Sequence, residues 1–112
     1  MGIPLRNTAL IEQGSPTFEH TCGIIAGSAI EWVQVDTTFP RSRTWSPLNY
    51  VEVLNNSAQE ITVYHNSTQD SQLIPAYMIK PFSNKPVRVL GIQNNGAVAT
   101  VAGDVILRFS RK

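Results

Sequence analysis

The stretch from residue 48 to residue 65, LNYVEVLNNSAQEITVYH, contains the clearest structural signal in this sequence. In its first half Val51 and Val53 fall on one side of an extended chain, and the residues between them fall on the other. Its second half, residues 60–65, alternates in the same way, and Asn, Ser and Gln separate the two halves. Two alternating runs around a short polar turn predict a β-hairpin over 48–65.

Similar short runs rich in Val, Ile and Thr fill the rest of the chain, with Gly, Pro and Asn between them. The predicted strands cover residues 21–26, 29–36, 48–54, 60–65, 73–81, 87–93 and 97–109. Pro75 should break the fifth or place it at an edge, the last could be a pair, and residues 82–86 and 94–96 should be turns. We expect almost no helix, because no long stretch carries an uninterrupted helical apolar stripe. Seven to eight short strands predict an all-β fold, a two-layer antiparallel β-sandwich of Greek-key or jelly-roll topology.

The length and charge of the chain limit its organisation and its partners. A chain of 112 residues fits one domain, which we place at residues 20–112, preceded by an extended N-terminal arm over residues 1–19. The net charge of +1 supplies no basic field, so nucleic-acid binding is not expected. The sequence lacks an apolar run suited to a signal peptide or a membrane span, so we expect synthesis in a cytoplasm and no membrane partner.

Candidate catalytic and metal-binding residues are few. Cys22 is the single cysteine, so it forms no intrachain disulfide, and we predict a small buried thiol. His20 would share a strand face with Cys22, which leaves a thiol–imidazole pair as an alternative. We predict that His65 is a partly buried, hydrogen-bonded side chain, and that Asn55 and Asn66 serve turns. The prediction is no catalytic, cofactor or metal site, with a cupin-like metalloenzyme as the enzyme alternative.

Two regions are candidates for contact with other proteins. Residues 37–47 combine aromatic residues, arginines and prolines, and aromatic and arginine side chains are enriched at interface hot spots. The arm carries apolar side chains that it cannot bury within itself. The predicted contact residues are Ile3, Leu5, Phe39, Arg41, Arg43 and Trp45. Aromatic side chains that could instead stack on sugar rings are Trp32, Trp45, Tyr50, Tyr64 and Tyr77.

Two neighbouring segments, ITVYHNSTQDSQLIPAYMIKPF (61–82) and KPVRVLGIQNNG (85–96), carry a resemblance to a known group. They resemble small β-sandwich proteins of tailed-bacteriophage virions, such as head decoration (cement) proteins and some tail or baseplate components. The resemblance implies a structural protein on the capsid surface of the virion, made in the host cytoplasm. It implies binding to major capsid subunits and to copies of itself, as a homotrimer or homodimer. The chain departs from some decoration proteins by lacking their long leader. The alternative is a carbohydrate- or receptor-binding module of a phage tail or baseplate.

Overall fold

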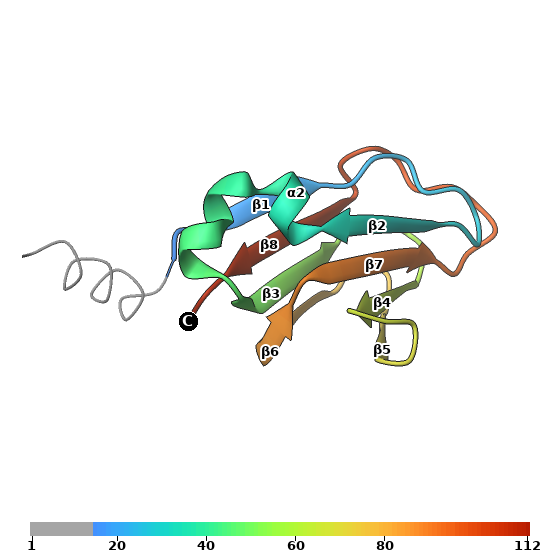
Figure 1. Cartoon of the computed structure of the whole chain (residues 1–112). Coiled ribbons are helices and arrows are strands. Elements are labelled where there is room, and N and C mark those ends of the chain that lie inside the picture. Colours follow the sequence, from blue (N-terminus) through green and yellow to red (C-terminus); the bar gives the residue numbers. More distant parts are fainter. Residues whose placement is uncertain (1–14) are drawn as a thin grey trace, which may run out of the picture.

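The computed structural model describes residues 15–112, which form two four-stranded antiparallel sheets packed face to face (Figure 1). The strands are β1 (Phe18–Thr21), β2 (Ile30–Gln34), β3 (Leu48–Asn55), β4 (Ile61–His65), β5 (Ser71–Ile74), β6 (Ile79–Val87), β7 (Val89–Asn94) and β8 (Val105–Ser110). One sheet has the order β1-β8-β3-β6 and the other has the order β2-β7-β4-β5. The predicted all-β sandwich is confirmed, and residues 1–14 of the predicted arm lie outside the described residues.

The strand pairing is that of a jelly roll. Starting from the β4–β5 hairpin, the ladders β3·β6, β2·β7 and β1·β8 pair strands that lie progressively further apart in the sequence. The chain therefore resembles one long hairpin rolled into two layers, and the ladders β3·β8 and β4·β7 complete the sheets. β1 pairs from Phe18 onward, so two residues of the segment predicted as arm belong to the sheet.

The predicted hairpin over 48–65 is wrong, although both of its strands exist. β3 pairs with β6 and β8, whereas β4 pairs with β5 and β7 in the other sheet. Residues 56–60 cross from one sheet to the other instead of turning back within one. Alternation fixes which face of a strand is buried, but it does not specify the strand's neighbours.

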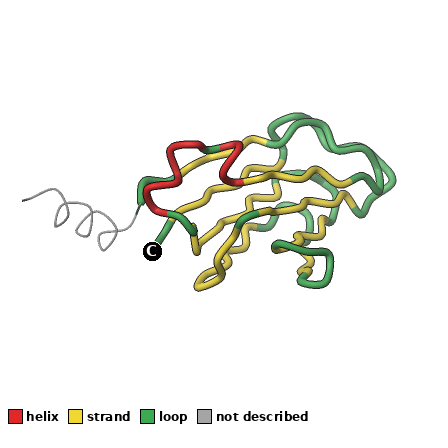
Figure 2. The backbone as a smooth tube through the Cα atoms, in the orientation of Figure 1, coloured by secondary structure: helices red, strands yellow, loops and turns green. Residues whose placement is uncertain are grey.

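Two further predictions about elements are corrected. Residues 82–86 are not a turn but part of β6, which lies at the edge of its sheet, where Pro81 and Pro86 are tolerated. Residues 22–26 are not a strand but the start of the β1–β2 connection. Almost no helix was expected, and the little that forms includes the one-turn helix α2 (Val35–Thr38) and the 3₁₀-helix η1 (Pro40–Trp45), both visible in red in Figure 2.

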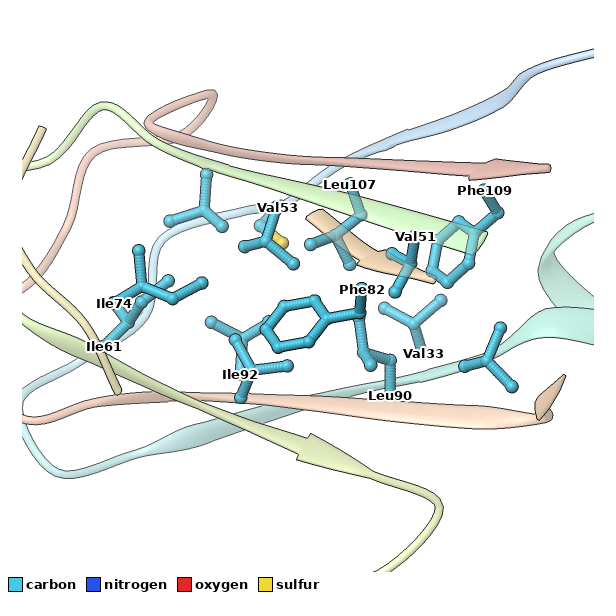
Figure 3. Packing of buried hydrophobic residues seen from close by; sticks show 14 of the residues in the cluster. Val33, Val51, Val53, Ile61, Ile74, Phe82, Leu90, Ile92, Leu107 and Phe109 are labelled. Atoms are coloured by element: carbon cyan, nitrogen blue, oxygen red, sulfur yellow. The ribbon is translucent and has the colours of Figure 1, made fainter. Parts of the chain in front are cut away.

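The core lies between the two sheets and consists of alternate residues from the strands (Figure 3). Val51, Phe109 and Phe82 project inward from one sheet, and Leu90 and Ile92 meet them from the other. All five are buried. The remaining members of this cluster are Cys22, Ile25, Val33, Val35, Leu48, Val53, Ile61, Val63, Ile74, Val87, Val105 and Leu107. The apolar side chains of both sheets therefore hold the layers together.

The two ends of the sandwich differ in construction. Antiparallel pairing brings four connections to one end, here called the loop end: residues 22–29, 56–60, 75–78 and 95–104. At the opposite end, here called the cap end, lie α2 and η1, the β4–β5 turn and the chain terminus at Lys112. The β1–β2 and β7–β8 connections run side by side at the loop end, far from α2 and η1 (Figure 1).

Candidate functional site

The loop end exposes apolar side chains. Ile24 is 69% exposed, Val98 65% and Val101 67%, and they lie on the adjacent β1–β2 and β7–β8 connections. Tyr77 and Met78, on the β5–β6 connection, are 69% and 52% exposed. Isolated exposed apolar residues are ordinary, and this group on three neighbouring connections is a candidate contact surface. Of these five residues, the sequence singles out only Tyr77, as a candidate for sugar stacking.

A buried asparagine at the end of β3 fixes part of this end. The side-chain nitrogen of Asn55 donates to the carbonyl oxygens of Gln59, Ile74 and Pro75 at 2.8, 3.3 and 3.1 Å. Its side-chain oxygen accepts from the backbone N–H and the hydroxyl of Ser57 at 3.1 and 2.6 Å. One fully buried amide therefore links the β3–β4 and β5–β6 connections. The prediction that Asn55 serves a turn is confirmed.

A second buried asparagine, at the end of β7, acts in the same way on the other two connections. The side-chain nitrogen of Asn94 donates to the carbonyl oxygens of Ile25 and Val98 at 3.0 and 2.8 Å, and its oxygen accepts from the Gly96 N–H. The backbones of Ile25 and Thr100 are also hydrogen-bonded across the two connections. The exposed apolar side chains thus project from loops whose backbones are held by buried polar groups.

The predicted contact residues of the cap end fall into two groups. Phe39 and Trp45 are half-buried and pack against the protein's own core, with Phe39 centroid distances of 5.7 Å to Phe18 and 5.5 Å to Phe109. The exposed Arg41 and Arg43 project from η1. The remaining two, Ile3 and Leu5, lie outside the described residues. The segment therefore closes one end of the sandwich, and Arg41 and Arg43 are among its exposed residues.

Two aromatic rings lie together on the outer face of the β2-β7-β4-β5 sheet. Trp32 and Tyr64 are stacked with ring centroids 6.0 Å apart, and Trp32 is 45% exposed. Gly91 lies between them in the register, and a Cβ atom at that position would come within 2.6 Å of the Trp32 ring. The missing side chain lets the indole lie on the sheet, and the Tyr64 hydroxyl donates to Gln93. Of the predicted sugar-stacking aromatics, these two form a shared surface.

The other predicted sugar-stacking residues lie apart from this surface. Tyr50 is half-buried on the outer face of the β1-β8-β3-β6 sheet, where the Lys112 ammonium lies 4.2 Å from its ring centroid. A shallow cavity of about 230 Å³ there is also lined by Thr17, Glu52, Arg108 and Ser110. Arg108 pairs with Glu19 and Glu52, which raises the guanidinium pKa above its usual value, chiefly through the hydrogen bond to Glu19. The paired charges suggest a solvated sheet face.

His65 is buried at the end of β4, and its expected hydrogen bonds are not found. Neither ring nitrogen has a partner within residues 15–112, and the side chain is 2% exposed. Its ring packs edge-on against Phe82, with centroids 4.6 Å apart. Burial lowers the pKa of His65, the Lys85 ammonium lowers it further, and the Asp70 carboxylate partly opposes them. The sequence placed His65 on the correct face, but the prediction of a hydrogen-bonded ring is wrong.

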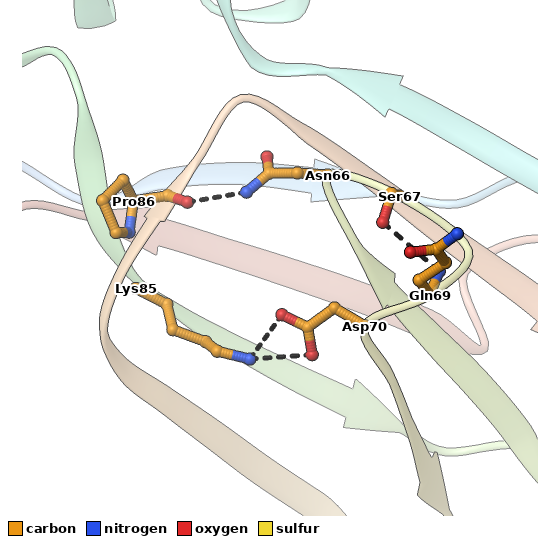
Figure 4. A network of polar contacts seen from close by, with 6 residues as sticks. All are labelled: Asn66, Ser67, Gln69, Asp70, Lys85 and Pro86. Carbon is orange, nitrogen blue, oxygen red and sulfur yellow. Dashed lines mark hydrogen bonds and ion pairs between the residues drawn. The ribbon is translucent and has the colours of Figure 1, made fainter.

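A polar network joins the β4–β5 turn to β6 (Figure 4), and the backbone N–H of His65 donates to the Asp70 carbonyl of this turn. The Lys85 ammonium donates to both carboxylate oxygens of Asp70, at 2.9 and 2.7 Å, and lowers the Asp70 pKa, mainly through this hydrogen bond. Asn66 has a positive φ of 61° and donates to the Pro86 carbonyl at 2.9 Å. Asn66 therefore serves the β4–β5 turn, as predicted, and ties it to β6.

His20 and Cys22 share the inward face of the chain at β1, as their spacing predicts, and they meet a third group. Glu31 of β2 lies with one carboxylate oxygen 3.0 Å from Nε2 of His20 and the other 3.2 Å from the Gly23 backbone nitrogen. Cys22 is buried, as predicted. Burial and the Glu31 carboxylate raise the pKa of its thiol, so the thiol is not an activated nucleophile.

The comparisons with known proteins add no family to this description. No protein-family model matches the chain, and no curated protein is significantly similar to it. No helix within residues 15–112 is long and apolar enough to cross a membrane. The functional argument therefore rests on the surfaces just described.

Sequence reasoning missed the loop end and the Glu31 contact. The exposure of Ile24 and Val101 depends on where the connections lie in the fold, and isolated apolar residues between glycines carry no such signal. Glu31, in contrast, does carry a signal in the sequence. It shares a strand face with the apolar Val33, opposite Trp32, so a carboxylate at that position indicates a polar partner inside.

Proposed function

We propose that this chain is a structural virion protein of a tailed phage that acts by binding and not by catalysis. In this proposal it is a capsid decoration protein that binds major capsid subunits and copies of itself on the capsid surface. The loop end is its docking surface. The observation that supports docking most directly is the group of five exposed apolar side chains on loops held by Asn55 and Asn94.

Fixed loops matter because association has to overcome the entropy of ordering the contact surface. At the loop end that ordering is largely complete in the single chain, because the buried amides hold the connections. Each of Ile24, Val98 and Val101 has about two-thirds of its surface left to bury. Full burial of such a side chain is worth roughly 1.5–3 kcal/mol, so each could supply about 1–2 kcal/mol of binding. Repetition over a lattice would multiply such modest contacts.

The fold and the resemblance supply the rest of the argument. Jelly rolls occur in viral capsid proteins, in lectins and in cupins, so the topology is compatible with a virion role without establishing it. The resemblance of residues 61–96 points to phage decoration proteins within that set. The cap end adds Arg41 and Arg43, which are exposed and remain candidate contacts to a neighbouring copy.

The first experiment tests the virion role. Particles of the phage that encodes the chain should be purified on a density gradient and analysed by quantitative mass spectrometry. A decoration protein should be present in a fixed number of copies per major capsid subunit, and it should remain after tails are removed. Its absence from the particles would refute the proposed function.

The second experiment tests the docking surface. Recombinant protein should be mixed with particles that lack it, and the bound fraction measured after sedimentation. Val101→Asp together with Met78→Asp should weaken binding by at least about tenfold, since about 1–2 kcal/mol is lost at each position. Thr68→Asp together with Gln69→Asp, which adds the same charge at two exposed positions of the β4–β5 turn at the cap end, is the matched control. Equal binding of all three proteins would rule out the loop end.

The stacked pair of Trp32 and Tyr64 favours one second candidate, a carbohydrate- or receptor-binding module of a phage tail or baseplate. The exposed Trp32 ring and the half-buried Tyr64 ring offer apolar faces for sugar rings, and Gln93 supplies a neighbouring amide. Glycan-array binding that is lost in Trp32→Ala but kept in Tyr77→Ala would support this candidate. It would also move the docking surface from the loop end to the sheet face.

A further inference from the structure

Three potential metal ligands converge at one lateral edge of the sandwich. β1 is an edge strand of one sheet and β2 is an edge strand of the other. His20 and Cys22 reach inward from β1 and the residue following it, and Glu31 reaches inward from β2. One donor atom from each side chain lies within 4.8 Å of the other two. The sequence separates these groups into two strands, but the jelly roll brings them together.

The donor set matches the preferences of zinc. Zn²⁺ is bound in proteins by thiolate sulfur, imidazole nitrogen and carboxylate oxygen, whereas Mg²⁺ and Ca²⁺ prefer oxygen alone. A thiolate and a carboxylate together would neutralise a divalent cation, and a neutral imidazole would add the third bond. Tetrahedral zinc holds its donor atoms roughly 3.3–3.6 Å apart. The 3.0 Å from His20 to Glu31 and the 4.8 Å limit of the cluster bracket this spacing.

The surroundings leave room for a fourth ligand. The side chains of His20 and Glu31 are 26% and 27% exposed, so one side of the cluster faces solvent. Cys22 is 1% exposed and closes the inner side. A half-open site with three protein ligands would complete its coordination with water or with a group from a docking partner.

Hydrogen bonding alone explains why a carboxylate occupies position 31. It does not explain why a thiol and an imidazole face that carboxylate. An inward-facing charge on an edge strand discourages pairing with another sheet, and Glu31 accepts hydrogen bonds from the Gly23 N–H and from His20. A hydroxyl at position 22 would donate to this carboxylate better than a thiol, which is a weak donor. The combination of a thiol and an imidazole on one carboxylate is instead a set of transition-metal ligands.

We propose that His20, Cys22 and Glu31 bind one Zn²⁺ ion and thereby link the two sheets at their open edge. The ion would fix β1 to β2 at the start of the connection that carries Ile24. It would therefore support the loop end, although the proposal does not depend on the virion role.

The test uses the full-length protein without an affinity tag, because tags with histidines bind zinc themselves. Residues 1–14 contain no histidine or cysteine to compete for the ion. Calorimetric titration with Zn²⁺ alone should give one site per chain, and Mg²⁺ should give none. Titration with Co²⁺ should produce a thiolate-to-cobalt charge-transfer band and the visible bands of four-coordinate cobalt.

Three variants connect the signal to the cluster. Cys22→Ser should abolish the charge-transfer band, and Cys22→Ser and Glu31→Gln should each weaken Zn²⁺ binding more than about 100-fold, since losing even an outer-shell partner costs about 10- to 100-fold. Glu19→Gln removes a carboxylate from the outward face of β1, the strand that carries His20. This variant should bind Zn²⁺ like the parent. If Cys22→Ser does not fold, the partly exposed Glu31→Gln decides. No binding by the parent, or equal binding by Glu31→Gln and Glu19→Gln, would overturn the proposal.

Discussion

Acidification should destabilise this protein through His65. In the folded state its pKa lies below the ordinary value of 6.5, chiefly because the ring is buried, and the nearby Lys85 ammonium adds to the effect. The Asp70 carboxylate opposes the shift, and Phe82 offers the ring no acceptor. As pH falls below 6.5, the unfolded chain therefore binds a proton that the folded chain does not bind. Stability is fully present above 6.5 and declines below it.

The size of this effect follows from linkage. A single proton taken up by the unfolded state alone lowers the free energy of unfolding by at most about 1.4 kcal/mol per pH unit. Between about pH 7.5 and pH 5.5 the integrated loss can therefore reach at most about 1.4 kcal/mol, because the unfolded histidine titrates halfway through that range. For a domain of this size that corresponds to a decrease in Tm of roughly 5–10 °C.

The matched variant is His65→Leu, which has a similar volume and no titrating group. Its two lost ring nitrogens have no partner within residues 15–112, and an unpaired buried polar group costs about 1–3 kcal/mol. The lost edge-on contact with Phe82 is worth about 0.5–1.5 kcal/mol, so the variant should be more stable by about 1 kcal/mol at neutral pH. The free energy of unfolding should be measured by urea denaturation of both proteins across the pH range, with tryptophan fluorescence as the probe. Parallel pH profiles for the parent and the variant would refute the assignment to His65.

Three other substitutions test the structural reasoning. Asn55→Ala should lower the free energy of unfolding by about 3 kcal/mol or more, because it leaves buried carbonyl and N–H groups of two connections unpaired; a urea midpoint close to that of the parent would contradict this role. Gly91→Ala should displace the Trp32 ring, which a Cβ atom would approach to 2.6 Å, and should cost about 1–3 kcal/mol; an unchanged near-ultraviolet circular dichroism spectrum would show that the ring does not depend on the glycine. Arg108→Gln should leave stability nearly unchanged, because its ion pairs with Glu19 and Glu52 are screened by solvent; a clear decrease in Tm would mean that the three charges act as a network.

The sequence predicted the sheets better than their connections. Val51 and Val53 alternate with polar or aromatic neighbours, and this pattern correctly predicts an extended strand with one buried face. The same pattern gave the wrong partner for that strand, because the five residues between β3 and β4 could turn back or cross to the facing sheet. The choice depends on the long-range ladders β3·β8 and β4·β7, which no local pattern specifies.

Proline caused the second failure of prediction. Pro86 ends the turn predicted over 82–86, and Pro81 ends the strand predicted over 73–81, yet both prolines lie within β6. The strand tolerates them because it is the edge of its sheet and hydrogen-bonds to a neighbour on one side only. Whether a strand is central or at an edge is a property of the assembled fold, so the same residues permit both interpretations.

The candidate site likewise contains features that local sequence predicts and features that depend on the assembled fold. The burial of Cys22 and the inward position of His65 follow from local alternation, and both predictions are confirmed. The proximity of His20 to Glu31 depends on two edge strands from different sheets meeting across the open side of the sandwich. Phe39 and Trp45 looked like contact residues because their composition is that of an interface, and the same properties let them cover the protein's own core.

The loop end shows why fold stability and surface chemistry need to be separated here. Its connections are held by polar groups that are buried, Asn55 and Asn94, whereas its apolar side chains point outward. Hydrophobic burial within the single chain therefore does not explain Ile24 or Val101, since these side chains keep two-thirds of their surface in water. Polar residues could occupy the same positions without loss of the hydrogen bonds that order the loops. Apolar side chains that stay in water gain hydrophobic stabilisation only when another surface covers them, and this is the physical basis of the docking that we propose for the loop end.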